Sequence, residues 1–297
     1  MEEPKTTLSQ QSLREIDDRR AFLDALVACE HKISPIMPGD FIRVGLDLGT
    51  SSIVLVVLSE AASPLALARE TANVVRDGLV VDFAKARTIT ERLRKSVESS
   101  LGVRLTRAAI AVPPKTSQRD AATHRYVCEG AGLEVDNIWE EPESANFFLK
   151  ILSGAIADIG GGTTGAAVFK DGQVVASFDE ATGGHHLSLV LAGHFKIAYE
   201  KAENFKLDPK NRSIITPVVA PVLSKMGSIL REGLKGYDIP KLYLVGGSAA
   251  APMAGPIISR ETNLPVEVLY QPELITPVGI ALGCPAYASD RLDLDLT

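Results

Sequence analysis

The spacing of apolar residues divides the chain into predicted strands and helices. Short apolar runs at 43–48 and 53–58, joined by a polar, glycine-containing turn, predict a β-hairpin. Apolar residues at helical spacing predict a helix around 89–97, and the run at 108–112 predicts a buried strand. The first half of the body therefore has the mixed pattern of an α/β protein.

The rest of the chain continues this alternation of strands and helices. In chain order we expect a helix at 116–131, a strand at 133–138, a helix at 142–152, strands at 155–159 and 166–169, helices at about 185–205 and 217–235, and a strand at 241–245 followed by a helix.

One strand–turn–strand pattern occurs twice. Asp47-Leu48-Gly49-Thr50-Ser51 and Asp158-Ile159-Gly160-Gly161-Gly162-Thr163 both place an aspartate near the end of a strand and a glycine-containing turn after it. An internal repeat at this scale predicts two related lobes. We expect an N-terminal helical extension at 1–40, lobe I at 41–150, lobe II at 151–285 and a tail at 286–297.

The N-terminal extension has the pattern of an amphipathic helix. Ile16, Leu23 and Val27 recur at helical spacing, and Pro35 and Pro38 stop the pattern. Two interpretations stay open: a helix docked on the protein's own body, or a helix that binds a partner.

The two turns have the chemistry of a phosphate site. Glycines let backbone N–H groups approach an anion, and Thr50, Ser51 and Thr163 add hydroxyl donors. An aspartate beside bound phosphates is best explained as a partner of Mg²⁺, which keeps several waters and takes one or two carboxylates. Two such turns, one in each lobe, predict a clamp on a polyphosphate.

A dinucleotide-binding motif is the competing interpretation of the second turn. Residues 160–165 satisfy G-x-G-x-x-G, but that motif should open a helix. The apolar run 166–169 that follows has the pattern of a strand, so we reject this alternative.

Charge and cysteine content exclude some classes of protein. The chain has 31 basic and 37 acidic residues and a net charge of −6, which argues against a broad nucleic-acid or membrane-lipid surface. Its three cysteines are widely spaced, as is typical of free thiols in a reducing compartment. The longest apolar run, 53–58, is far shorter than the roughly 20 residues of a membrane helix. We expect a cytoplasmic protein.

These motifs resemble a known superfamily. Residues 44–52 and 158–163 resemble the two phosphate motifs of actin-like and heat-shock-chaperone ATPases, Glu141-Pro142 their connecting motif, and 244–248 their adenosine motif. More narrowly, 75–78 (VRDG), 158–165 (DIGGGTTG) and 181–186 (ATGGHH) resemble the EutJ family of ethanolamine-utilisation proteins. The resemblance covers about residues 42–284.

The resemblance implies an actin-like ATPase fold: two related ribonuclease-H-like lobes with a cleft for ATP or ADP and Mg²⁺ between them. It implies phosphate contacts by Gly49, Thr50, Ser51, Gly160, Gly161, Gly162 and Thr163. It implies nucleoside contacts by Gly183, Gly184, Glu200, Gly246, Gly247 and Ser248. Asp47 and Asp158 would hold Mg²⁺ through water, and Glu141 would position the metal or the attacking water.

The resemblance also implies a chaperone-like protein of ethanolamine utilisation that acts on an enzyme or shell protein of a bacterial microcompartment. Gly165 departs from the pattern, because heat-shock chaperones and bacterial actins carry a carboxylate there. We therefore expect slow ATP hydrolysis. The alternatives are an actin-like protein that self-associates into filaments, and a nucleotide-gated scaffold without hydrolysis. For His185 and His186 we expect a structural or capping role.

Overall fold

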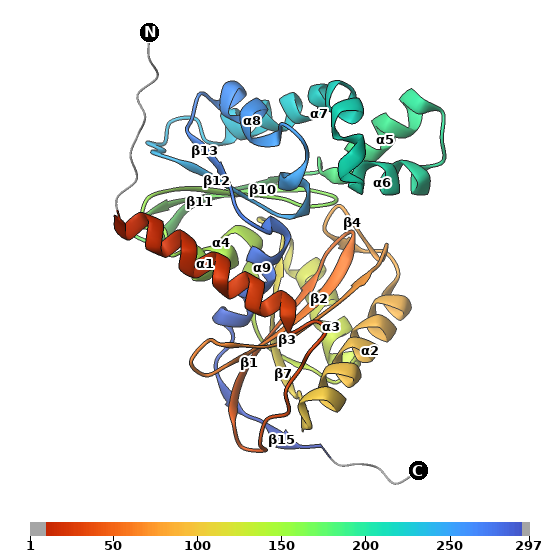
Figure 1. Cartoon of the computed structure of the whole chain (residues 1–297), viewed down its shortest axis with the longest axis vertical. Helices are drawn as coiled ribbons and strands as arrows, with labels where there is room; N and C mark the ends of the chain where they lie inside the picture. The colour runs from red at the N-terminus through yellow and green to blue at the C-terminus, as the bar shows by residue number, and fades with distance from the viewer. Residues whose placement is uncertain (1–9, 293–297) are drawn as a thin grey trace.

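Two lobes lie one above the other in Figure 1, and a long N-terminal helix runs along their junction. The computed structural model describes residues 10–292 of the 297-residue chain. Each lobe is built around one central sheet.

Lobe I is built on strands from the first half of the chain. Its sheet has the order β3-β2-β1-β7-β8, with β14 also pairing β1. Its strands are β1 (Phe41–Leu48), β2 (Ser52–Ser59), β3 (Pro64–Thr71), β7 (Arg107–Val112), β8 (Glu134–Glu140) and β14 (Tyr287–Ala288). Helices α2 (Phe83–Leu101) and α3 (Gln118–Gly130) cover it, and β4 (Val75–Arg76) pairs with β5 (Leu79–Val80) in a small hairpin.

Lobe II repeats this arrangement with later strands. Its sheet has the order β11-β10-β9-β12-β13. Its strands are β9 (Gly154–Ile159), β10 (Thr164–Lys170), β11 (Gln173–Glu180), β12 (Leu242–Val245) and β13 (Val266–Val268). Its helices are α5 (Gly184–Phe195), α6 (Tyr199–Leu207), α7 (Arg212–Gly233) and α8 (Ala254–Thr262), with short 3₁₀ turns η1 (Pro209–Asn211) and η2 (Gly247–Ala250).

The two sheets share one topology. In each, three antiparallel strands are followed by two parallel ones, with β9, β10, β11, β12 and β13 in the places of β1, β2, β3, β7 and β8. The two turns also match in detail: the Gly49 N–H donates to Ser52 O and the Gly160 N–H to Thr163 O, both at 3.0 Å. The predicted repeat is confirmed.

Two helices cross between the lobes. Helix α4 (Glu141–Leu149) leads from β8 to β9, and α9 (Pro272–Gly283) leads from β13 back to lobe I (Figure 1). They pack backbone against backbone: a Cβ added at Gly279 would lie 1.8 Å from Ser144 O. After α9, β14 pairs with β1, and β15 (Asp290–Arg291) pairs with β6 (Val103–Arg104).

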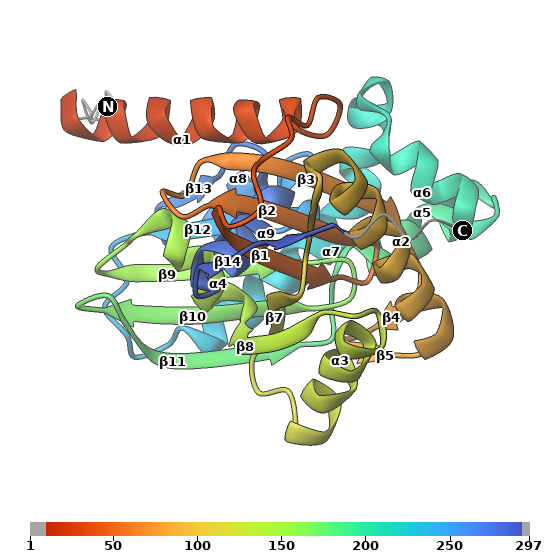
Figure 2. The ribbon, with the colours of Figure 1, turned by 90° about the horizontal axis from the view of Figure 1, so that it is seen from below.

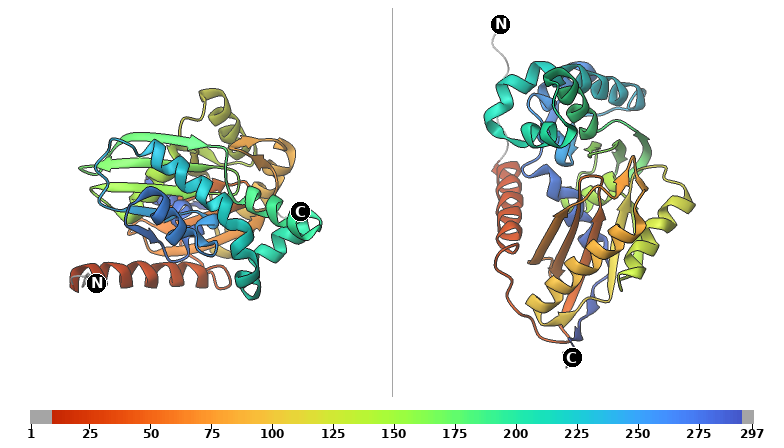
Figure 3. Two further views of the ribbon diagram at one scale, coloured as in Figure 1. Left: turned by 90° about the horizontal axis from the view of Figure 1, so that it is seen from above. Right: turned by 90° about the vertical axis from the view of Figure 1, so that its right-hand side faces the viewer.

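Helix α1 (Gln10–Ala28) lies along this junction on one side of the molecule, as Figures 2 and 3 show. It contacts both lobes. Glu30, just after the helix, forms a two-bond ion pair with Arg69 of β3, and Asp24 accepts a 2.8 Å hydrogen bond from the Tyr270 hydroxyl. The guanidinium of Arg20 lies 5.4 Å from the centre of the Tyr270 ring. The helix is therefore docked on the protein's own body.

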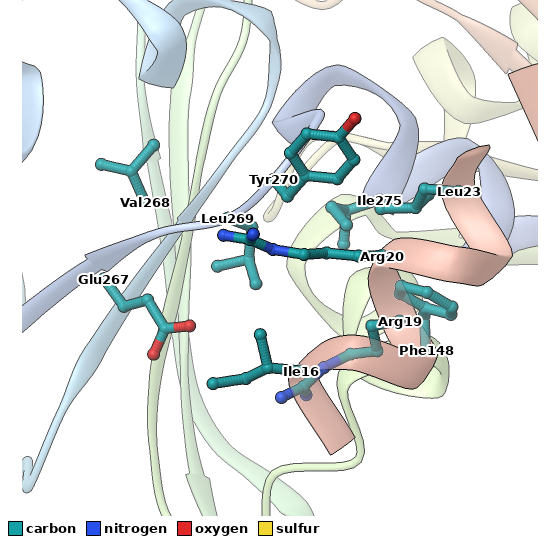
Figure 4. A pocket seen from close by; sticks show the side chains of 10 residues that line it. All are labelled: Ile16, Arg19, Arg20, Leu23, Phe148, Glu267, Val268, Leu269, Tyr270 and Ile275. Carbon is teal, nitrogen blue, oxygen red and sulfur yellow. The ribbon is translucent and has the colours of Figure 1, made fainter. Parts of the chain in front are cut away.

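A small cavity of about 60 Å³ remains between α1 and lobe II (Figure 4). Ile16 and Leu23 line it from the helix, and Leu269 and Ile275 line it from the body. Leu23 and Leu26 are completely buried in an apolar cluster that also contains strands and helices of both lobes.

Two helix predictions needed correction. The predicted helix at 185–205 is two helices, because Lys196 adopts φ +53° and ends α5 before α6 begins. The helix expected after the turn at 246–248 starts only at Ala254, as α8, because the 3₁₀ turn η2 comes first.

Among the described residues, one stretch, 209–233, is long and apolar enough to cross a membrane by length and composition. Its core-facing residues Ile215, Val219 and Leu223 are buried in lobe II. A core helix passes the same test, so this stretch is weak evidence for a membrane span.

We expect Leu26→Ala to lower the free energy of unfolding by about 2–5 kcal/mol, because it leaves a cavity in a fully buried cluster. Urea denaturation of the two proteins measures this. Leu152, 71% exposed, is the control, and Leu152→Ala should change stability by about 0.5 kcal/mol or less. Equal losses in both variants would contradict the docking of α1.

Candidate functional site

Two glycine-containing turns meet where the lobes face each other. The first, 49–51, joins β1 to β2, and the second, 160–163, joins β9 to β10. A Cβ added at Gly161 would lie 2.4 Å from Ser51 Oγ, and one at Gly162 would lie 2.8 Å from Thr50 Oγ1. The turns predicted to clamp a polyphosphate are therefore in direct contact across the lobes.

The start of α5 holds the second turn in place. The backbone N–H groups of Gly184 and His185 donate to Gly160 O at 2.9 Å and Gly161 O at 2.7 Å. A Cβ added at Gly183 would lie 2.7 Å from Gly161 O and 2.8 Å from Gly160 O, so the sequence needs glycine there.

A third turn, 246–248, closes the other side. Ser248 Oγ donates to Gly160 O at 2.7 Å. Gly246 has φ +85°, and a Cβ there would lie 2.2 Å from Asp158 Oδ1. Only a residue without a side chain fits this conformation and this gap.

Three carboxylates lie beside the turns. Asp158 is buried and accepts a 2.5 Å hydrogen bond from Thr276 Oγ1 of α9, while Asp47 and Glu141 are half-buried. Burial raises the pKa of Asp158 to about 6, against the opposing effect of Thr276. Burial and the charge of Asp158 raise the pKa of Asp47 to about 7, and burial, Asp158 and Asp47 raise the pKa of Glu141.

The structure brings together the three predicted carboxylates and the glycines and hydroxyls of the three turns. Glu200 is different: it is exposed in the first turn of α6, and no hydrogen bond or ion pair recorded for residues 10–292 joins it to the turns. His186 Nδ1 accepts from the Gly183 N–H at 3.3 Å, which is a capping contact, and His185 Nδ1 lies 2.9 Å from the Tyr199 hydroxyl.

Sequence reasoning missed three residues at this site. Thr276 lies on a helix that was not predicted, and Asp77 borders Gly162, whose added Cβ would lie 2.9 Å from Asp77 N. Asp179 on β11 hydrogen-bonds Thr163 and contributes to the raised pKa of Glu141. The acidic pair at 179–180 was the available signal for Asp179.

The chemistry of these donors fits a bound divalent cation. Neighbouring carboxylates with raised pKa values repel one another when ionised, and a cation relieves that repulsion. No group of three His, Cys, Asp or Glu side chains in the described part of the chain converges to hold a metal directly. The arrangement suits Mg²⁺ that keeps its waters.

Comparison with known proteins decides the family. The chain is 41% identical over 239 residues to the ethanolamine utilization protein EutJ of Salmonella typhimurium, covering 80% of this chain and 84% of that protein. The chain belongs to the EutJ family. The crystal structure of EutJ from Carboxydothermus hydrogenoformans matches with a TM-score of 0.82 and 43% identity, over 92% of this chain and 99% of that one. No protein-family model matches.

More distant relatives show the fold. MreB5 of Spiroplasma citri, solved bound to ADP, matches this chain with a TM-score of 0.66 at 17% identity, over 82% of this chain and 95% of that one. The chaperone protein HscA homologue of Burkholderia lata is 24% identical over an alignment of 267 positions, gaps included, that covers 72% of this chain and 43% of that protein. The fold is the actin-like ATPase fold, as predicted.

We expect Gly183→Ala to destabilise the protein by about 1–3 kcal/mol, because its methyl group would collide with backbone oxygens of the second turn. Gly193, inside α5, is the matched control, since a Cβ there meets no atom within 4 Å. Gly193→Ala should instead stabilise by about 0.5–1 kcal/mol. Thermal denaturation distinguishes the two, and a tolerated Gly183→Ala would contradict the packing of the turns.

Without Mg²⁺ the protein should lose stability as the pH rises from about 4 to about 7. The folded state keeps a proton on Asp47, pKa about 7, over a range in which the unfolded chain, pKa about 3.8, has released it. Unfolding therefore releases a proton, and a higher pH favours unfolding.

Asp47→Asn should flatten this dependence in denaturation curves measured at pH 5 and pH 8 in low salt. Glu60→Gln, at an exposed position, is the control and should keep the wild-type slope. A wild-type protein more stable at pH 8 than at pH 5 would disagree with the raised pKa.

Proposed function

We propose that this EutJ-family chain binds ATP with Mg²⁺ between its lobes and hydrolyses it slowly, as a chaperone-like protein of ethanolamine utilisation. The observation that carries the proposal is the meeting of two equivalent turns, one from each lobe, beside Asp47, Asp158 and Glu141. Such a pair presents donors to a polyphosphate from two sides.

The backbone and hydroxyl donors of the turns would bind the phosphates. Thr50 and Ser51 offer hydroxyls from lobe I, and Thr163 offers one from lobe II, beside glycines that leave the backbone accessible. Glycines 160–162, 183–184 and 246–247 with Ser248 supply the rest of the proposed nucleotide surface. Glu200 is the least supported nucleoside contact, because it is exposed on α6.

The carboxylates would hold Mg²⁺ and orient water. Asp47 and Asp158 would bind the waters of the cation, whose charge offsets that of the phosphates. Glu141 starts α4 and faces both aspartates, so it would orient a water molecule bound to the cation. Thr276 fixes the side chain of Asp158 through its hydrogen bond.

Nucleotide entry would require the lobes to separate. The first and second turns touch in the structure, at distances that leave no room for a phosphate between Ser51 and Gly161. A nucleotide that contacts both turns would then favour the arrangement in which the turns are separated by the width of the nucleotide. It could shift the equilibrium only by the difference between its affinities for the two arrangements.

The protein partner is proposed from the family. We propose that the chain acts in the cytoplasm on an enzyme or shell component of an ethanolamine-degrading microcompartment. The alternative of a filament-forming protein rests on the fold it shares with MreB5, and self-association would be its signature.

We expect calorimetry to detect binding of Mg²⁺-ATP and a phosphate-release assay to detect slow hydrolysis. Asp158→Asn should abolish release and weaken binding at least tenfold, because it removes one of the two magnesium-facing charges. Asp171→Asn, in the exposed turn between β10 and β11, is the control and should behave as wild type.

The possible outcomes lead to different conclusions. Binding with release supports the ATPase. Binding without release favours a nucleotide-gated scaffold. Absence of binding contradicts the proposal as a whole, and nucleotide-dependent pelleting of the protein would favour the filament.

A further inference from the structure

Asp158, Gly165 and Asp179 form one row across three strands of lobe II. Gly165 pairs with Asp158 on β9 and with Asp179 on β11, so the side chains of both aspartates lie on the same face of the sheet. Neighbouring strands are about 4.8 Å apart, which places the two side chains about 10 Å from each other. The glycine between them has no side chain of its own to fill the space above it.

The Asp179 carboxylate points into this space. A Cβ added at Gly165 would lie 3.1 Å from Asp179 Oδ1 and 2.7 Å from Pro114 Cδ of lobe I. Any larger residue at 165 would therefore displace Asp179 or Pro114. The glycine is explained by the carboxylate that lies over it.

Asp179 Oδ1 is a buried acceptor without a donor. It is one of four buried side-chain polar atoms without a hydrogen-bond partner in the described part of the chain, although Thr163 hydrogen-bonds the same carboxylate. A buried acceptor without a partner costs free energy, so a native protein keeps one where something else satisfies it. Burial also raises the pKa of Asp179 to about 6, with smaller contributions from Asp158 and Asp77.

We propose that Asp179 is the residue that positions the attacking water in ATP hydrolysis. This inference rests on the proposed function. The carboxylate reaches the second turn through its hydrogen bond with Thr163, which is proposed to bind phosphate, and its free Oδ1 can accept a hydrogen bond from the water. Asp47 and Asp158 face the cation, and Glu141 lies beside these two aspartates. Asp179 is the carboxylate that hydrogen-bonds Thr163 of the second turn, so we assign it to the attacking water.

In this step the water oxygen forms a bond to the terminal phosphorus. The bond from that phosphorus to the bridging oxygen breaks, and its electron pair stays with ADP. One proton of the water passes to the departing inorganic phosphate. Asp179 holds the water in line with the bond that breaks.

The test compares Asp179→Asn with Glu180→Gln, a control on the next, exposed position of the same strand. We expect Asp179→Asn to bind Mg²⁺-ATP within about threefold of wild type in calorimetry and to lower kcat of phosphate release about a hundredfold or more. The free Asp179→Asn protein should also have a higher Tm than wild type at pH 8, because the amide removes a buried charge. Glu180→Gln should leave binding, release and Tm unchanged.

A residue that only supports the sheet would give another result. Its variant would lower Tm, and it would weaken binding together with release. Wild-type release in Asp179→Asn would overturn the inference and leave the proposed ATPase standing. Absence of release from the wild type, with binding retained, would overturn both this inference and the hydrolysis that it serves.

Discussion

The structure depends on bringing acidic groups from two lobes to one point. Asp47 comes from lobe I, Asp158 from lobe II, and Glu141 from the helix that joins them, and each raises the pKa of a neighbour or has its own pKa raised by burial. Placing like charges together costs free energy that the packing of the lobes has to offset. A bound cation with a polyphosphate would remove this cost. The proposed ligand therefore accounts for both the acidic site and the glycine turns beside it.

The connections between the lobes suit this requirement. The two sheets do not share a strand, and the chain crosses between them at α4 and α9. These helices touch at Gly279 and Ser144 with no side chain between them. Contacts between small residues tolerate a change of angle better than interdigitated large side chains, because no large side chain has to change rotamer. Movement of the lobes would therefore change the distance between the turns while each sheet stays intact.

The sequence predicted the central hairpins and the three turns, because their signals are local. An apolar run, an aspartate and glycines identify β1–β2 and β9–β10 without knowledge of the partner strands. The repeat then predicted the two lobes. Elements whose pattern depends on distant contacts were missed: β3 and β11 lie at sheet edges with mixed exposure, and α9 contains Pro277 within its apolar run.

The missed elements also explain the missed site residues. Thr276 lies on α9, and its role depends on a hydrogen bond to a residue 118 positions away. Asp179 lies on β11, and the register that places it beside Gly165 cannot be derived from spacing along the chain. Glu200 stays a prediction: the motif suggested a nucleoside contact, and the break at Lys196 sets α6 apart from α5 and leaves that side chain exposed.

Helix α1 adds a further constraint on the lobes. Its C-terminal half and the residues just after it are tied to different parts of the body: Glu30 binds Arg69 on β3, whereas Asp24 and Arg20 contact Tyr270 near the start of α9. Rotation of lobe II against lobe I changes the distance between Arg69 and Tyr270, so α1 has to slide or release one set of contacts. The exposed ion pair contributes little to stability, while Leu23 and Leu26 are completely buried. The apolar face of α1, more than its charges, therefore determines how far the lobes can separate while the helix stays docked.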